Sequence, residues 1–104
     1  MKKRFSCPVE LALEVLGGKW RVVILANIKE GAARYADLRR RIPRMSEKML
    51  TQRLRELVET GLIANRGGAY QLTERGDRAR KALTALHSFG EFLAPQLKVQ
   101  IDAA

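Results

Sequence analysis

The sequence predicts a mainly α fold with one small β-hairpin, and three observations support this prediction. Apolar residues recur at helical spacing along most of the chain. Gly17-Gly18, Pro43 and Gly61 separate these segments as helix breaks. Two short segments flank Gly67-Gly68, which is typical of a tight hairpin turn. With 104 residues, the chain is long enough for one domain with a small core.

The best-defined element is a helix from Ser46 to Gly61. Ser46 is a favourable N-cap residue, and Gly61 is a favourable residue just past a helix C-terminus. One quadrant of the helix is apolar and should be buried; it comprises Leu50, Leu54, Leu57 and Val58. The helix should therefore dock on the core along one face.

The opposite face of this helix carries charges in an unusual order. Its first half is basic and polar, with Lys48, Thr51, Gln52 and Arg55. Glu56 and Glu59 follow, although the helix dipole favours cations near the C-terminus. A phosphate backbone beside the N-terminal half would offset the cations and leave the acids clear of it. The pattern indicates a recognition helix.

The charge of the whole chain also favours a polyanionic partner. Net charge is +9, with a pI near 10.5. Between Arg34 and Arg55, eight basic residues stand against two acidic ones, so this segment carries +6 of the +9. The basic patch and the predicted recognition helix coincide.

Several other classes of protein are disfavoured. One cysteine and one histidine cannot form a disulfide or a structural zinc site within the chain. No nucleophile motif or paired carboxylates indicate an enzyme, and Gly17-Gly18-Lys19 lacks the spacing of a phosphate loop. We therefore predict no enzyme activity, cofactor or metal. Since the longest uncharged apolar run is Val22 to Ala26, we expect a cytosolic protein without membrane association.

The segments before the recognition helix predict three further helices. The first begins at Cys7-Pro8 and ends at Gly17. The second begins at Lys19, is apolar almost all round, and should be the most buried element. The third runs from Tyr35 to Ile42 with Arg39 to Arg41 largely outward, and a short turn leads from it to Ser46. Two short helices joined in this way predict a helix-turn-helix.

The segments after it predict a wing and one long helix. Leu62 to Asn65 and Ala69 to Leu72 should pair as the hairpin. Thr73 should cap a helix that Pro95 ends. That helix carries a heptad stripe of Ala79, Leu83, Leu86, Gly90 and Leu93, which packs either on a partner helix or on its own domain. We predict a single domain over 1–104, with a core over 7–93 and a fraying tail over 94–104.

These motifs together resemble those of the HxlR-type winged helix-turn-helix transcriptional regulators. The matching segments are Cys7 to Glu10, Gly17 to Trp20, Arg34 to Arg40, Ser46 to Leu57, Gly61 to Ile63 and Tyr70 to Gly76. The resemblance implies a homodimer joined through its first and last helices, with two recognition helices in successive major grooves of a pseudo-palindromic operator. The family wing usually has a longer, proline-containing tip, which Arg66-Gly67-Gly68 replaces here.

Site residues follow from these patterns. The predicted DNA-binding residues are Arg34, Arg39, Arg40, Arg44, Ser46, Lys48, Thr51, Gln52, Arg55 and Arg66. The predicted dimer interface comprises Val9, Leu13, Ala79, Leu83, Leu86, Phe89, Gly90 and Leu93. Trp20 and Tyr35 should belong to the core, and His87 should be structural or exposed.

Cys7 allows two interpretations. Its place at a helix start, after three basic residues, favours a reactive thiolate, and the resemblance adds that some family members sense oxidants or electrophiles through an N-terminal cysteine. Alternatively, Cys7 is a small buried hydrophobic residue. Of the protein as a whole, we predict a duplex-DNA-binding regulator; the alternatives are a small basic RNA-binding or ribosome-associated protein and a winged-helix module that binds another protein.

Overall fold

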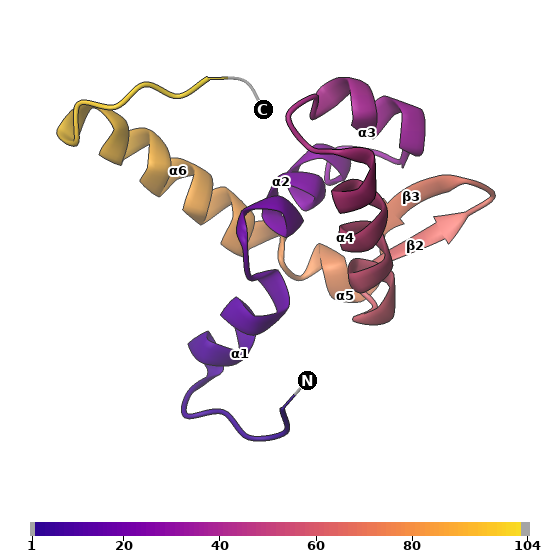
Figure 1. Cartoon of the computed structure of the whole chain (residues 1–104). Coiled ribbons are helices and arrows are strands. Elements are labelled where there is room, and N and C mark those ends of the chain that lie inside the picture. The colour runs from indigo at the N-terminus through magenta and orange to yellow at the C-terminus, as the bar shows by residue number, and fades with distance from the viewer. Residues whose placement is uncertain (1, 103–104) are drawn as a thin grey trace.

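The computed structural model describes residues 2–102 as six helices and three short strands (Figure 1). In chain order the elements are α1 (Pro8–Leu16), α2 (Lys19–Ile28), β1 (Ala33–Arg34), α3 (Tyr35–Arg41), α4 (Glu47–Glu59), β2 (Ile63–Arg66), β3 (Ala69–Leu72), α5 (Glu74–Asp77) and α6 (Arg80–Gln96). The fold is a winged helix-turn-helix, as the sequence predicted.

The core lies between α2, α3, α4 and the sheet. Its fully buried side chains include Ile24 and Leu25 of α2, Leu38 of α3, and Leu50 and Leu57 of α4. The predicted stripe of α4 is confirmed except at Val58, whose side chain is 41% exposed. Val58 lies at the edge of the stripe, beyond the width that the core covers.

The turn between α3 and α4 is short and tightly bonded. Met45, which is buried, donates its backbone N–H to the Ile42 carbonyl over 3.1 Å. Ser46 is the N-cap of α4, and its Oγ accepts the Met49 N–H over 3.1 Å. This confirms the predicted cap and fixes the entry of the chain into α4.

The wing is a hairpin with a third strand beside it. Gly67 and Gly68 have φ of 62° and 93°, and Asn65 Oδ1 accepts the Gly68 N–H over 2.8 Å. β1 pairs with β3 through Ala33 and Tyr70, so the strand order is β1-β3-β2. The sequence did not predict β1, because two residues are too few to show a period.

The prediction of one long terminal helix was wrong. Thr73 caps only the single turn of α5, where its Oγ1 accepts the Gly76 N–H. Ala79 then donates its N–H to the Gly76 carbonyl, three residues back, which interrupts the α-helical pattern before α6 begins. Gly76 lies against the Leu62 carbonyl, which allows α5 to pack close to the start of β2.

Pro95 does not end α6, contrary to the prediction. It lies in the last turn, and α6 continues to Gln96. The helix is closed by Lys98 in the left-handed region at φ 57°. Val99 donates its N–H to the Ala94 carbonyl over 2.9 Å, and Lys98 donates to Pro95 over 3.2 Å, which together form a Schellman motif.

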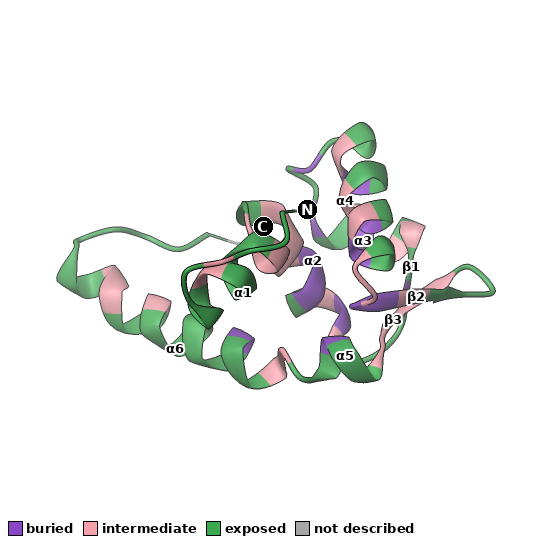
Figure 2. Ribbon diagram, turned by 90° about the horizontal axis from the view of Figure 1, so that it is seen from below, coloured by how far each residue is buried: buried purple, intermediate pink, exposed green. Residues whose placement is uncertain are grey.

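The helices differ in how much of their surface the fold covers (Figure 2). α1 has no buried residue, and α6 buries only Leu83. Both project from the body of the domain in Figure 1. No helix within residues 2–102 combines the length and apolar content that crossing a membrane requires.

Replacing Gly76 with Ala should destabilise the domain. The new Cβ would lie 1.9 Å from the Leu62 carbonyl oxygen, so β2 or α5 must shift. We expect a loss of about 2 kcal/mol or more in the free energy of unfolding, measured by urea denaturation. Gly31→Ala is the control, because open space surrounds that Cβ. Equal stability of the two variants would contradict this packing.

Candidate nucleic-acid interface

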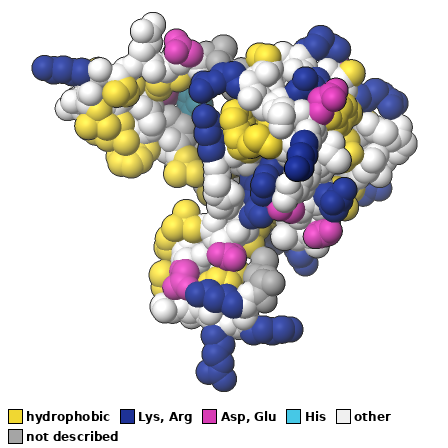
Figure 3. Space-filling view, viewed as in Figure 1, with side chains coloured by type: hydrophobic (Ala, Val, Ile, Leu, Met, Phe, Trp, Pro, Cys, Tyr) yellow, Lys and Arg dark blue, Asp and Glu magenta, His cyan; other side chains and the backbone are white. Residues whose placement is uncertain are grey.

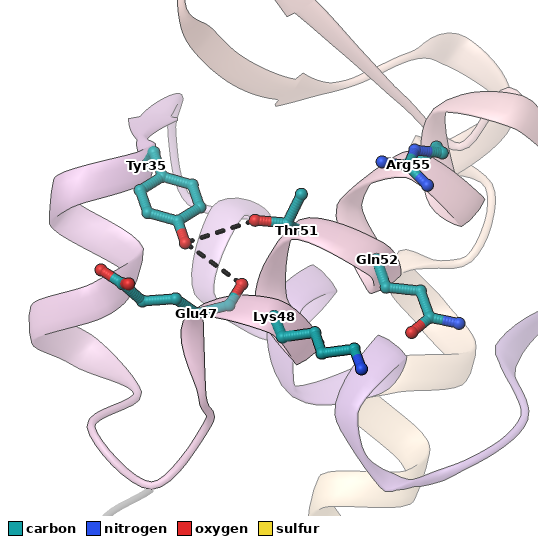
Figure 4. Close-up of a pocket in the computed structure, with 6 residues that line it drawn as sticks. All are labelled: Tyr35, Glu47, Lys48, Thr51, Gln52 and Arg55. Atoms are coloured by element: carbon teal, nitrogen blue, oxygen red, sulfur yellow. Dashed lines mark hydrogen bonds between the residues drawn. The ribbon is translucent and has the colours of Figure 1, made fainter.

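The exposed face of α4 forms an open hollow of about 530 Å³ (Figure 4). Its walls are Tyr35, Glu47, Lys48, Thr51, Gln52 and Arg55. Many Lys and Arg side chains lie on the surface of the half of the molecule that carries α3 and α4 (Figure 3). The structure thus brings together four predicted DNA-binding residues of α4 on one accessible surface.

Tyr35 joins the first helix of the motif to the second. Its side chain is half-buried and packs against the core, as predicted. Its hydroxyl also donates to the Glu47 carbonyl over 3.2 Å and lies 3.4 Å from Thr51 Oγ1 (Figure 4). Tyr35 therefore positions Thr51 within the hollow, which was not predicted.

Three side chains of the hollow are free to contact a ligand. Lys48, Gln52 and Arg55 are exposed, and their side chains have no hydrogen bond or ion pair within the described residues. Ser46 differs, because its Oγ is engaged as the cap. Only the helix backbone positions Lys48, Gln52 and Arg55, so their polar groups stay available to bind a ligand.

Glu56 does not lie on the outer face, contrary to the interpretation from sequence. Arg21 of α2 donates to Glu56 Oε1 through Nε over 3.1 Å and through Nη2 over 3.0 Å. Arg53 donates to the same oxygen over 2.6 Å, so its charge is paired with Glu56. The order of charges along α4 therefore has a structural cause as well.

Arg21 also reaches the end of α1. Its Nη1 donates to the Glu14 carbonyl over 3.1 Å and to the Val15 carbonyl over 3.3 Å. One guanidinium thereby joins α1, α2 and α4. Arg21 is one of two charged residues at the start of an otherwise largely apolar helix, but nothing in the sequence indicated its partners.

The Glu56 carboxyl has a pKa below its usual value. Partial burial of the carboxylate acts to raise the pKa, but the hydrogen bonds and charges of Arg21 and Arg53 outweigh burial and lower it. The ionised form is thus favoured in the folded state. Its ion pairs stabilise the fold at neutral pH.

The other end of α4 is fixed by α5. Arg75 donates to the Thr60 carbonyl over 2.8 Å, which satisfies one of the free carbonyls at the helix C-terminus. Thr73 donates its hydroxyl to the Gly61 carbonyl. Together with the Ser46 cap, these contacts hold both ends of α4.

The three consecutive arginines of α3 have different surroundings. Arg39 is half-buried, and its Nη1 donates to the Met45 carbonyl, so Arg39 braces the turn before α4. Arg41 donates to the Asn27 carbonyl over 3.1 Å. Arg40 is 71% exposed and pairs with Asp37. Arg40 and Arg41 are thus exposed to solvent, whereas Arg39 is half-buried.

Asp37 holds the start of α3. Its carboxylate accepts the Arg34 backbone N–H over 2.9 Å. That bond, and next the bond from Arg40, lower the pKa of the Asp37 carboxyl, and nearby arginine charges act in the same direction. Arg40 is therefore oriented along the outer side of α3 by an ionised partner.

The wing lies beside the start of α3. Arg34 donates to the Gly67 carbonyl over 3.1 Å and so packs across the hairpin turn. Arg66 is exposed on β2, and Arg44 is exposed in the turn before α4. The remaining predicted basic residues thus flank the α4 face on two sides.

The predicted dimer residues fall into two groups. Leu83 is only 6% exposed and belongs to the protomer's own core, so it is not available to a partner. Ala79, Gly90 and Leu93 are half-buried. The side chains with large exposed fractions are Val9 (64%), Leu13 (63%), Leu86 (53%) and Phe89 (58%).

Two further residues can be placed. Cys7 is exposed at the start of α1, so the interpretation as a buried hydrophobic residue was wrong for the protomer. His87 is 70% exposed and lies 3.3 Å from Glu91, as expected of a surface residue. Within residues 2–102, no three side chains of the metal-binding types cluster closely enough to hold an ion.

The sequence profile of HxlR-like helix-turn-helix proteins matches residues 15–98. The chain belongs to the HxlR-like helix-turn-helix family. It is 39% identical over 95 residues to an HTH-type transcriptional regulator of Methanothermobacter thermautotrophicus, covering 84% of this chain and 72% of that protein. It is 37% identical over 101 residues to the HTH-type transcriptional regulator YkvN of Bacillus subtilis, covering 90% and 86%.

Solved structures agree with this assignment. The redox regulator HypR in its oxidised form superposes with a TM-score of 0.72 at 33% identity, covering 82% of this chain and 95% of that one. The HxlR-like protein described here is thus a transcriptional regulator with a helix-turn-helix DNA-binding domain. The predicted family and fold are confirmed.

Replacing Glu56 with Gln should destabilise the fold at neutral pH by about 1 to 2 kcal/mol, since it leaves Arg21 and Arg53 unpaired. Because the pKa of Glu56 is lowered in the folded state, this contribution is present above the usual value near 4.5 and is lost as pH falls through the lowered pKa. Urea denaturation from pH 7 to pH 3 measures both effects.

Glu59→Gln is the matched control, because it removes the same charge from α4 at an exposed position with no ion pair among the described residues. A Glu56 effect that equals the Glu59 effect, or that does not change with pH, would contradict the role of the ion pairs.

Proposed function

We propose that this HxlR-like regulator binds a pseudo-palindromic operator in duplex DNA as a homodimer, as a repressor or an activator. One recognition helix, α4, enters the major groove of each half-site. Thr51, Gln52 and Arg55 face the base edges, and Lys48 lies beside the phosphate backbone. The observation that supports this most strongly is a rigidly held helix whose exposed polar side chains have no partner in the fold.

The roles of these side chains follow from their chemistry. Gln52 suits bidentate bonding to adenine, and Arg55 suits bidentate bonding to guanine. Arg40, Arg44 and Lys48 lie around the α4 face as phosphate contacts, which set the register of the protein on the duplex. Arg34 and Arg66 place two further cations at the wing, although its tip is short.

Binding should depend steeply on salt. If a dimer contacts about 6 to 10 phosphates, affinity for duplex DNA falls by roughly 10³- to 10⁵-fold between about 50 and 200 mM salt. Fluorescence anisotropy with duplex DNA and with a structured RNA of equal length measures this. Tighter binding of the RNA, or affinity that is insensitive to salt, would refute the proposal.

Two substitutions should separate base contacts from phosphate contacts. Arg55→Ala should cost about 1 to 3 kcal/mol on the preferred site and relax preference at one base pair. Arg40→Ala should weaken binding to all duplex sequences alike and reduce the salt dependence. Competition assays on a set of single-base-pair variants of the site measure both. If Arg55→Ala weakened all sequences alike and Arg40→Ala relaxed preference at one base pair, the proposed roles of α3 and α4 would be wrong.

The homodimer is supported by the apolar surface that the protomer leaves uncovered. Leu86, Phe89 and Phe92 are all more than half exposed along α6, and Val9 and Leu13 are exposed along α1. Figure 3 shows hydrophobic side chains gathered on both projecting helices. Exposed apolar side chains gathered in this way on a small domain are typical of a protein interface.

Replacing Leu86 with Asp should therefore give monomers. A charge placed within an apolar interface is costly, so the dimer dissociation constant should rise by about 10²-fold or more. Thr84→Asp is the control, since Thr84 is exposed on another side of α6. Sedimentation velocity over a range of concentrations measures this. A Leu86→Asp variant as dimeric as the Thr84→Asp variant would place the interface elsewhere.

A second candidate function is thiol-dependent regulation. Cys7 is exposed at the start of α1, beside the proposed dimer surface, and one similar protein is named a redox regulator. We expect oxidation or alkylation of Cys7 to change operator affinity by about tenfold or more, because a shift of α1 alters the spacing of the two recognition helices. If treatment with the oxidant or alkylating agent leaves operator affinity unchanged, or changes it equally in the Cys7→Ser variant, Cys7 does not have this role.

A further inference from the structure

The hydroxyl of Tyr35 has two partners between α3 and α4 but only one proton. Its Oη lies 3.2 Å from the Glu47 carbonyl oxygen and 3.4 Å from Thr51 Oγ1, and both contacts meet at this one oxygen (Figure 4). A carbonyl oxygen only accepts, whereas a Tyr or Thr hydroxyl donates one proton and also accepts. Both contacts are therefore satisfied in one way only. Tyr35 donates to Glu47, and Thr51 donates to Tyr35.

The Glu47 carbonyl is also the group to which the Thr51 hydroxyl would bond in an ordinary helix. This carbonyl accepts the Thr51 backbone N–H in α4, and a helical Thr hydroxyl often bonds the carbonyl four residues back. Thr60 shows that arrangement, since its Oγ1 donates to the Glu56 carbonyl over 3.1 Å. Tyr35 instead occupies the second lone pair of the Glu47 carbonyl. The Thr51 proton is thus directed to Tyr35.

This polarity decides what Thr51 can offer to a ligand. Thr51 is exposed in the α4 hollow, and its proton is used within the fold, so its hydroxyl presents only lone pairs outward. Lys48 and Arg55, which line the same hollow, carry only donors. A phosphate group carries acceptors and is therefore a poor partner for Thr51. In the major groove, the matching donors are the amino groups of adenine and cytosine.

We propose that Tyr35 is a positioning residue for sequence recognition. It fixes Thr51 as a hydrogen-bond acceptor, and Thr51 thereby selects adenine or cytosine at one position of each half-site. The inference rests on the proposed function, in which α4 enters the major groove. Guanine and thymine present acceptors and no donor there, so either base would leave two acceptors facing each other without a proton. Tyr35 itself contacts no base, because its proton is held by Glu47.

Tyr35→Phe tests this role, because it removes the hydroxyl and keeps the ring that packs on the core. The Thr51 hydroxyl is then released to donate to guanine or thymine, or to the Glu47 carbonyl, and in each case the preference falls. We expect the wild type to favour adenine or cytosine at that position by about fivefold or more, and Tyr35→Phe by about twofold or less. Competition binding with all four base pairs at each position of the selected site measures both.

Two further variants separate this role from a merely structural one. Tyr70→Phe is the matched control, because it removes the hydroxyl of another half-buried tyrosine outside the α4 hollow, and it should change preference at every position by about twofold or less. Thr51→Val removes the hydroxyl at nearly constant size and identifies the position that Thr51 reads. Adding Tyr35→Phe to Thr51→Val should change the preference there no further, since Tyr35 acts through Thr51.

The preference at the Thr51 position decides between the possible outcomes. A preference for guanine or thymine there would overturn the role of Tyr35 and leave α4 as the recognition helix. The same conclusion would follow if Tyr35→Phe kept the wild-type preference, or weakened binding to all sequences alike without changing it. If neither Thr51→Val nor Arg55→Ala altered preference at any position, α4 would not read bases, and the proposed function would fail together with this inference.

Discussion

Burial of one face of α4 is the constraint on which the rest of this domain depends. Leu50, Leu54 and Leu57 are each at most 2% exposed, so the rotation of the helix about its axis is fixed by the core. That rotation leaves Lys48, Gln52 and Arg55 in solvent. The DNA contacts that we propose for α4 are therefore a consequence of packing, because the apolar stripe decides which side chains remain available.

The polar contacts around α4 then determine how firmly this face is held. Ser46 closes the N-terminus of the helix, Arg75 the C-terminus, and Arg21 binds Glu56 on its flank. Arg21 also bonds the end of α1, the helix that begins at Cys7 and carries part of the proposed dimer surface. A displacement of α1 would thus reach the recognition helix through a single guanidinium, which gives the proposed thiol response a physical route.

Much of this arrangement could be predicted from the sequence, because local signals determine it. Ser46 and Gly61 bound α4 through their backbone preferences, and the apolar period sets its buried face. The errors arose where a distant contact decides the outcome. α5 packs closely on the start of β2 through Gly76 and Leu62, and Glu56 turns inward because Arg21 lies beside it. Neither partner can be identified from spacing along the chain.

For the predicted sites, too, local patterns were sufficient where helical period decides the arrangement and insufficient where a distant contact decides it. Side chains on the exposed face of α4 were correctly grouped, since helical period alone places them together. The bond from Arg39 to the Met45 carbonyl could not be predicted, because it depends on how the turn before α4 folds.

Selection of bound sequences from a pool of random duplex DNA tests the recognition helix most directly. Two α4 helices related by a two-fold axis should enrich an inverted repeat whose half-sites are centred one helical turn apart, about 34 to 36 Å or 10 to 10.5 base pairs. The Arg55→Ala protein should lose preference at one symmetry-related pair of positions. Enrichment of a single unrepeated motif, or no enrichment at all, would contradict a dimer that reads DNA through α4.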